Sequence, residues 1–235
     1  MRTAVLSRAA ALYIGVTGLT ALAVAALFWR SDVPAAALPT FVLVTVLGMV
    51  AHAFPIRAAR HQAYQVTLPF IIIAAALFTM PQLVAFIVLI HLAEQARTRR
   101  PLYIVAFNLS DYFLSAAVAT AFYHRAIILM PAGALGQVEA ALAAGCAFIM
   151  LNRVLLMGVL WLARGLSPSR CGLFKPELLA ADLVIIWIAA PMLVLTTQAG
   201  PWMAVVTAGP LCLMRPALVS LLAERDRPTT MANAA

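Results

Sequence analysis

Charged residues are scarce in this sequence. Asp, Glu, Lys and Arg together make up 10% of its 235 residues, whereas soluble globular proteins carry about 25%. Apolar residues make up 65%, and the mean hydropathy is +1.00. Almost the whole chain consists of apolar runs separated by short arginine-rich loops, which leaves no segment for a soluble catalytic domain. The composition therefore predicts an integral membrane protein.

Motifs for catalysis and metal binding are also lacking. There is no GxSG serine motif, no HExxH and no pair of aspartates in YD and GxGD contexts, so nothing predicts intramembrane hydrolysis. The three cysteines are far apart and form no CxxC pair, which argues against a disulfide framework or a zinc site. We therefore expect no enzyme activity, no metal and no cofactor other than bound lipid.

Histidine is the one remaining residue type that suggests cofactor ligation. The sequence holds four histidines, His52, His61, His91 and His124. Each could in principle bind haem or a metal ion. Histidines near membrane interfaces act more often as polar anchors, and we interpret these four in that way.

Eight apolar segments predict an all-α bundle of membrane helices. Two of them hold about 15 residues each and are too short for an ordinary span of about 20; they cover 66–80 and 81–96, with Pro81 marking the break between them. This pair forms either two short spans or a re-entrant hairpin with its tip at Met80 and Pro81. The six long spans are expected at about 9–29, 36–54, 102–124, 138–163, 177–198 and 201–223.

Basic residues indicate the orientation of this bundle. With a cytoplasmic N-terminus, the outer loops hold only Arg30 and Arg125. Both termini should then be cytoplasmic. The net charge of +8 indicates contact with anionic lipid head groups and not with nucleic acid. The basic residues expected inside are Arg2, Arg8, Arg57, Arg60, Arg97, Arg99, Arg100, Arg164, Arg170, Lys175, Arg215, Arg225 and Arg227.

The chain is expected to form a single transmembrane domain over 1–226. Residues 227–235 form a short cytoplasmic tail that is too short and polar to fold by itself. We interpret the first apolar segment as an uncleaved span, because Phe28, Trp29 and Arg30 follow it where a polar mature domain would begin.

Polar residues interrupt the run LYIVAFNLSDYFLSAA, which covers 102–117. At 1.5 Å per residue, Asn108 lies about 9 Å and Asp111 about 13 Å beyond the start of this helix. An unpaired carboxylate at that depth is costly. Arg153 and Arg215 reach a similar depth from the same side. We therefore predict that Asp111 pairs with Arg153, with Arg215 or with both.

These residues belong to a predicted polar cluster in the cytoplasmic half of the bundle. Its members are Asn108, Asp111, Asn152, Arg153, Asp182 and Arg215, with His91 and Glu94 at its edge. One interpretation is structural, with ionic and amide pairs fixing the packing of the helices. The other is functional, with the cluster forming a ligand pocket, a proton path or a signalling switch. The sequence leaves both open.

Two further features bear on helix shape and packing. Pro191 and Pro210 lie inside the last two predicted spans, where each removes a backbone hydrogen bond and should kink its helix. Trp187 lies well inside its predicted span, and we expect it to pack between helices.

Several stretches together resemble a known membrane module. They are AHAFPI, VTLPFIIIAAALFTMPQLVAF, RTRRPLYIVAFNLSDYFLSAAVATAFYH, MLNRVLLMGVLWLARG, APMLVL and GPLCLMRPALVSLLAERD. In this order they resemble the N-terminal multi-helix module of bacterial cyclic-dinucleotide signalling proteins, over about 51–226. That module precedes an HD-type phosphohydrolase or diguanylate cyclase domain. The most informative positions are Arg100, Pro101, Phe107, Asn108, Asn152, Pro191, Pro210 and Arg215.

The resemblance implies a sensory or regulatory membrane module. This sequence ends at Ala235, where that family would continue into its output domain. We therefore expect a non-catalytic, multi-pass protein of the bacterial inner membrane that contacts other membrane proteins or a separate output protein. Two alternatives stay open: a substrate-capture subunit of a transporter, and an accessory subunit of a respiratory or photosynthetic complex.

Overall fold

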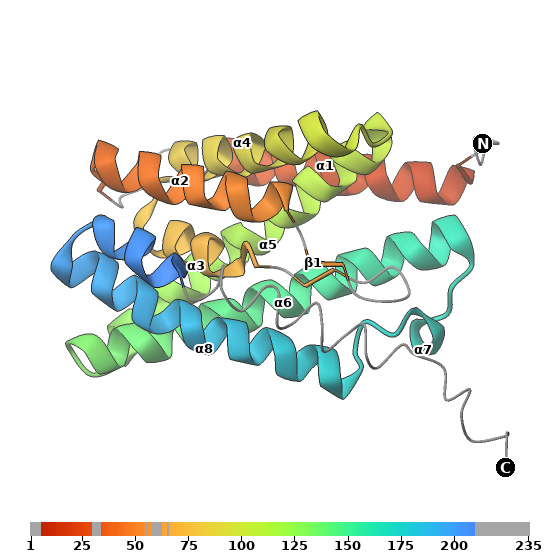
Figure 1. The fold of residues 1–235 in the computed structure, drawn as a ribbon. Helices are drawn as coiled ribbons and strands as arrows, with labels where there is room; N and C mark the ends of the chain where they lie inside the picture. Colours follow the sequence, from red (N-terminus) through yellow and green to blue (C-terminus); the bar gives the residue numbers. More distant parts are fainter. Residues whose placement is uncertain (1–5, 30–33, 55, 58–62, 65, 210–235) are drawn as a thin grey trace, which may run out of the picture.

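The computed structural model describes residues 6–29, 34–54, 56–57, 63–64 and 66–209 (Figure 1). The regular structure in these residues is helical, apart from the two-residue strands β1 (Ile56–Arg57) and β2 (Ala63–Tyr64), which pair antiparallel between α2 and α3. Residues 202–209 are also helical. The labelled helices are α1 (Arg8–Leu27), α2 (Leu38–Ala53), α3 (Leu68–Leu77), α4 (Met80–Thr98), α5 (Leu102–Leu129), α6 (Ala134–Arg164), α7 (Pro168–Cys171) and α8 (Pro176–Ala199).

Four helices, α1, α5, α6 and α8, are long and apolar enough to cross a membrane. The α5 and α6 helices hold 28 and 31 residues, and both are longer than the roughly 30 Å of hydrocarbon that a span must cross. The α2 helix holds only 16 residues, so it is shorter than the long span expected at 36–54. The span expected at 201–223 lies partly outside the described residues, and the number of six long spans stays a prediction.

The turn between α3 and α4 lies before Pro81 and not at it. The α3 helix ends at Leu77, and Phe78 and Thr79 are extended. Thr79 caps α4: its side chain accepts from the backbone of Gln82, whose side chain accepts from the Thr79 backbone at 3.1 Å. Pro81 lies in the first turn of α4, where its missing N–H costs nothing. Because of this cap, α4 begins at Met80 and is longer than the predicted segment.

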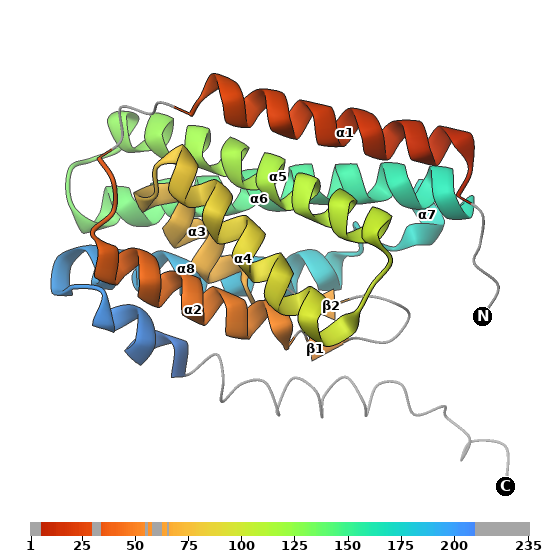
Figure 2. The same cartoon turned by 90° about the horizontal axis from the view of Figure 1, so that it is seen from above.

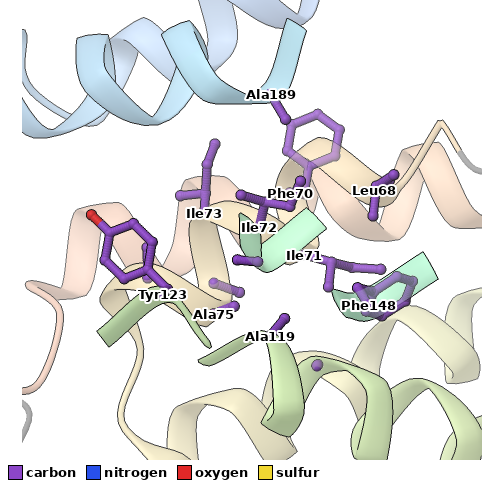
Figure 3. Close-up of a cluster of buried hydrophobic side chains, with 14 of the residues drawn as sticks. Leu68, Phe70, Ile71, Ile72, Ile73, Ala75, Ala119, Tyr123, Phe148 and Ala189 are labelled. Carbon is purple, nitrogen blue, oxygen red and sulfur yellow. The ribbon is translucent and has the colours of Figure 1, made fainter. Parts of the chain in front are cut away.

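The short α3 helix lies at the centre of the bundle and is buried from Leu68 to Ala76. It contacts α2, α5, α6 and α8. Figure 3 shows its isoleucines and Phe70 among Tyr123 of α5, Phe148 of α6 and Ala189 of α8. Its 10 residues extend about 15 Å, half the hydrocarbon thickness. The end of α3 inside the bundle is tolerated because protein, and not lipid, surrounds its backbone.

Small residues let the helices around α3 approach one another closely. A Cβ atom added to Gly145 of α6 would lie 2.8 Å from Ile186 of α8 and 3.0 Å from Ile72 of α3. Lipid tails are as apolar as the protein interior, so helix association in a bilayer depends on close packing of this kind. Gly145 therefore marks a point where α3 and α8 both pack closely against α6.

The α2 and α4 helices run parallel and are joined at both ends (Figure 2). At one end, the backbone of Ala36 exchanges two hydrogen bonds of 3.0 Å with the Gln82 side chain. At the other end, Arg97 donates to the carbonyl of Ala53 and stacks on Phe54, with its guanidinium 4.1 Å from the ring centroid. The hairpin tip is therefore level with the start of α2.

The two ends of the bundle differ in charge. We call the end where α1, α3, α5 and α8 begin the basic end. Hydrogen bonds from Ser7 to the Leu162 carbonyl (2.8 Å) and from Tyr13 to the Leu155 carbonyl (3.1 Å) place the start of α1 beside the end of α6 there. Of the described basic residues, only Arg125 lies toward the opposite end. The basic end holds Arg8, Arg97, Arg99, Arg100, Arg164, Arg170 and Lys175.

Two expectations for α8 have different outcomes. Trp187 is 62% exposed, so the prediction that it packs between helices is wrong; its side chain faces outward, where the bilayer would cover it. Pro191 lies inside α8, which continues to Ala199. The other proline expected to kink a helix, Pro210, lies outside the described residues.

Candidate functional site

One group of buried polar side chains joins α5, α6 and α8, and we call it the three-helix polar group. On α5, Asp111 is 2% exposed. Its carboxylate accepts hydrogen bonds from Asn152 Nδ2 on α6 at 3.0 Å and from Ser115 Oγ one turn along α5 at 3.4 Å. These contacts satisfy part of the carboxylate's need for donors without a cation.

The second link of this group is an ion pair between α6 and α8. Arg153 pairs with Asp182, and both residues are 8% exposed. The predicted ion pair between Asp111 and Arg153 is therefore wrong. Consecutive residues on a helix point about 100° apart, so Asn152 faces α5 while Arg153 faces α8. The α6 helix thus binds two neighbours through adjacent residues.

The remaining predicted members of the cluster do not join this group in the described part of the chain. Asn108 is half-buried on α5, one turn before Asp111, and no hydrogen bond links its side chain to the group. Arg215, the other predicted partner of Asp111, lies outside the described residues. The Nη1 atom of Arg153 is buried and has no hydrogen-bond partner among the described residues.

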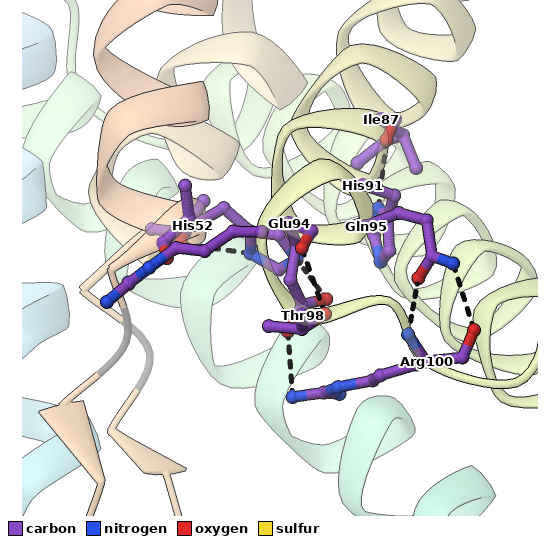
Figure 4. A network of polar contacts seen from close by, with 10 residues as sticks. His52, Ile87, His91, Glu94, Gln95, Thr98 and Arg100 are labelled. Carbon is purple, nitrogen blue, oxygen red and sulfur yellow. Dashed lines mark hydrogen bonds and ion pairs between the residues drawn. The ribbon is translucent and has the colours of Figure 1, made fainter.

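A second polar group, which we call the histidine cluster, lies at the basic end between α2, α4 and α5 (Figure 4). The expected edge residues His91 and Glu94 belong to it. On α2, His52 lies between two partners: its Nδ1 is 3.2 Å from the hydroxyl of Thr67, just before α3, and its Nε2 is 3.4 Å from the Glu94 carboxylate. The other Glu94 oxygen pairs with Arg100 at 2.9 Å.

Three rings pack together in this cluster. The centroids of His52 and His91 are 4.7 Å apart, and the ring of Tyr112 on α5 lies 5.2 Å from His52 and 4.9 Å from His91. The far side of Tyr112 packs edge-on against Phe148 of α6 at 5.8 Å. Tyr112 follows Asp111 in the chain, so α5 carries both groups on neighbouring faces.

Backbone contacts hold the end of α4 beside this cluster. The Gln95 side chain exchanges two hydrogen bonds of 2.9 Å with the backbone of Arg100 (Figure 4). Between them, Arg99 adopts the left-handed conformation, with φ of 48°. The turn after α4 therefore directs Arg100 back to Glu94.

The arrangement offers little for metal or cofactor chemistry. In residues 6–209, apart from the short undescribed stretches, no three His, Cys, Asp or Glu side chains lie close enough to hold a metal ion. The direct contact of His52 with His91 leaves no room for a macrocycle between them. An open hollow of about 600 Å³ at the end of α1 is lined by Ala25, Ala26, Leu27 and Trp29; of these side chains only Trp29 has a polar atom, its indole N–H, and none is charged.

Sequence reasoning missed four members of the histidine cluster, namely His52, Thr67, Arg100 and Tyr112. Their separation in the sequence hid them, because His52 meets His91 only through the parallel packing of α2 and α4. One signal was present: His91 and Glu94 lie one turn apart near the end of the segment predicted at 81–96, where buried polar side chains need partners from another helix.

Comparison with known proteins yields no relative. No family model, no curated protein and no solved structure matches this chain. The proposals for its function therefore depend on the geometry of the two polar groups and on the sequence.

Proposed function

We propose that this chain is a non-catalytic, multi-pass sensory or regulatory module of the bacterial inner membrane, which acts through helix packing and contacts with partner proteins. The observation that carries the proposal is how the buried charges are used. Asp111, Arg153, Asp182 and Glu94 each bind a side chain from another helix or from a loop at the basic end. Because these links join different helices, the relative position of the helices depends on the charge and the hydrogen bonds of these four side chains.

The histidine cluster supports a regulatory role more than a purely structural one. Buried ionisable groups inside a membrane bundle are costly and tend to mark functional positions. His91 is 2% exposed, and its Nε2 has no hydrogen-bond partner among the described residues. A cluster serving packing alone would be more stable with an apolar side chain at this position.

The proposed orientation places the basic end in the cytoplasm, where positively charged loops are retained. Anionic lipid head groups would then contact Arg99 and Arg164, both exposed at that end. The α3–α4 hairpin returns the chain to the side from which it entered, so both termini would be cytoplasmic. Because the tip at Gln82 is level with the start of α2, we favour two short crossings over a shallow re-entrant loop.

The partner in this proposal is a cytoplasmic output protein or another membrane protein. The resemblance to the membrane modules of cyclic-dinucleotide signalling proteins suggests that helix movements reach an output domain at the cytoplasmic end. Here α4 and α6 both end at the basic end, and the turn after α4 carries Arg100. A partner bound there would respond to changes in the histidine cluster.

Purification under mild conditions tests the proposal. The tagged full chain, expressed at its native level, is extracted in mild detergent and all co-purifying proteins are identified by mass spectrometry. A protein partner in fixed stoichiometry is expected. Recovery of the chain alone with a bound small molecule would contradict a partner-dependent role and indicate substrate capture.

Reporter fusions test the orientation separately. A periplasm-active phosphatase inserted at 131–133, between α5 and α6, should be active. The same enzyme inserted after Gly165, between α6 and α7, should be inactive. The reverse pattern would contradict the proposed orientation while leaving the helix packing unaffected.

A further inference from the structure

We propose that the histidine cluster is a proton-sensitive latch. It holds α2, α3 and α4 against α5 when its two imidazoles are neutral, and it releases these three helices from α5 when the cytoplasmic side becomes acidic. The inference rests on the proposed function and supplies its stimulus. Histidine is suited to this task because its ordinary pKa of about 6.5 lies closest to neutral.

The hydrogen bonds of His91 show why a second proton has no place in the closed cluster. Its Nδ1 lies 2.9 Å from the carbonyl of Ile87. A carbonyl only accepts, so Nδ1 carries the hydrogen and the neutral ring keeps its lone pair on Nε2. A proton added at Nε2 would be buried without an acceptor, beside a ring of His52 whose centroid is 4.7 Å away.

His52 connects the cluster to two other elements. Its Nε2 lies 3.4 Å from Glu94 and forms no well-aligned hydrogen bond there, while Nδ1 contacts the hydroxyl of Thr67. With Nδ1 unprotonated, Thr67 must donate; with both nitrogens protonated, Thr67 must accept. The protonation state of His52 is therefore coupled to the start of α3.

The charges of the cluster balance only while both histidines are neutral. Arg100 carries one positive charge and Glu94 one negative charge. Protonation of one imidazole gives the cluster a net charge of +1, and protonation of both gives +2, with Glu94 as the one carboxylate of the cluster. In a low-dielectric interior, two adjacent imidazolium rings repel each other strongly. Movement of α2, α3 and α4 together away from Tyr112 of α5 relieves this repulsion by admitting water beside both imidazoles.

Among the described residues, no further acid compensates these protons from the neighbouring elements. Facing the two imidazoles are the hydroxyl of Thr67 before α3 and the ring of Tyr112 on α5, and Phe148 of α6 lies behind Tyr112. The nearest other carboxylates belong to the three-helix polar group, where Asp111 is bound to Asn152 and Asp182 to Arg153. On α4, Arg97 adds positive charge beside Ala53.

The direction of the pH effect follows from this balance. The open arrangement lets the imidazoles take up protons in water, whereas the closed one offers His91 Nε2 no acceptor and has one described carboxylate, Glu94, beside Arg100 for the added positive charge. The closed state is therefore favoured above the ordinary histidine pKa of about 6.5 and weakened as the pH falls below it. The α2 helix and the hairpin should move together, because Gln82 and Arg97 join them at both ends.

Distance measurement between spin labels tests the latch in the full chain reconstituted in lipid nanodiscs. One label pair replaces the exposed residues Val50 of α2 and Ala106 of α5, and a reference pair replaces Leu12 of α1 and Val154 of α6. The native cysteines Cys146, Cys171 and Cys212 are replaced by serine. Between pH 7.5 and 5.5, the Val50–Ala106 distance should change by about 2 Å or more, as in other helix shifts, and the reference distance should stay constant.

Glutamine variants identify the titrating groups. The double variant His52→Gln/His91→Gln should lose the change, whereas His124→Gln, a half-buried histidine elsewhere on α5, should retain it. If the double variant is not folded at pH 7.5, the two single variants decide the question, and each should reduce the change at least twofold.

Three results would overturn the latch: no distance change in the unmodified chain, an unaltered change in the glutamine variants, or an equal change in the reference pair. None of these would contradict the proposed function, since a fixed-stoichiometry partner could still be present without pH sensing. Conversely, a pH-dependent distance without any partner would leave the latch standing and contradict the partner-dependent role.

Discussion

Asn152 donates a hydrogen bond of 3.0 Å to Asp111 on α5, while the next residue, Arg153, pairs with Asp182 on α8. Two consecutive residues of α6 thus hold two different helices. The two links differ in chemistry, because one is an amide–carboxyl contact and the other is an ion pair. Substitutions should therefore affect them differently.

Removing one partner of the buried ion pair should be strongly destabilising. Asp182→Ala leaves the buried guanidinium of Arg153 without its counter-charge, and we expect a loss of about 3 kcal/mol in the free energy of unfolding. The double variant Arg153→Met/Asp182→Leu removes both charges and should recover most of that loss. Reversible unfolding in mixed detergent measures the free energy of unfolding of the unmodified protein, of Asp182→Ala and of the double variant.

Arg164→Ala is the matched control for this pair, because Arg164 is an exposed arginine on the same helix as Arg153. The free energy of unfolding of Arg164→Ala should stay within about 0.5 kcal/mol of that of the unmodified protein. A loss in the double variant at least as large as that of Asp182→Ala would show that the unpaired charge of Arg153 is not what destabilises Asp182→Ala.

Asp111 should tolerate an amide but not a truncation. Asp111→Asn keeps an oxygen that accepts from Asn152 Nδ2, so its cost should stay below about 1 kcal/mol, whereas Asp111→Ala leaves a buried donor unsatisfied and should cost about 1–3 kcal/mol. Asn108→Ala, one turn away and half-buried, serves as the control with little effect. Equal losses for Asp111→Asn and Asp111→Ala would indicate that the negative charge itself is required, which points to a cation not included in the present contacts.

Gly145 should not tolerate a side chain. A methyl group at this position would lie 2.8 Å from Ile186 and 3.0 Å from Ile72, so Gly145→Ala must push α8 or α3 outward and should cost about 1–3 kcal/mol. The control is Gly15→Ala on α1, where nothing lies within 4 Å of the added Cβ. Thermal aggregation in detergent, followed by size-exclusion chromatography, compares the two variants; a lower midpoint for Gly15→Ala than for Gly145→Ala would contradict the packing described here.

Neutralising Glu94 should move the opening of the latch to higher pH. In the closed cluster, the Glu94 carboxylate is the one anion among the described residues that pairs with His52 and Arg100. In Glu94→Gln, the two imidazoles of the closed state bind protons less readily than before, whereas the open state is unaffected. Opening is therefore favoured at a higher pH than in the unmodified protein. The midpoint of the spin-label distance change, recorded from pH 8 to 5, should therefore rise. Glu139→Gln, a half-buried glutamate on α6, should leave it unchanged, and a fall of the midpoint in Glu94→Gln would argue against the charge balance.

The histidine cluster illustrates why parts of the fold could not be predicted from the sequence. The alternation of apolar runs and short loops places helices along the chain, but it does not say which helices are neighbours. His52 and His91 meet because α2 and α4 pack in parallel, with the short α3 helix returning the chain between them. The start of α4 depends on the Thr79 cap and not on Pro81, and a threonine cap is a weaker sequence signal than a proline.

Trp187 illustrates a second cause. In water, a large apolar side chain gains free energy by facing the protein core. In a bilayer, lipid tails and the protein interior are almost equally apolar, so this preference disappears. Hydropathy therefore predicts that Trp187 lies at membrane depth but not toward which side it points, and its side chain faces outward.

The amino-acid sequence by itself determined that the protein is helical, that it is apolar enough for a membrane, and that polar residues such as Asp111 and His91 lie within its apolar segments, because composition and the hydropathy of successive segments are local properties. Only the tertiary structure decided the partners of those residues. Whether Asp111 meets Asn152 or Arg153 depends on a rotation of about 100° between adjacent helix positions and on which helix faces each side of α6, and both follow from the packing of the whole bundle.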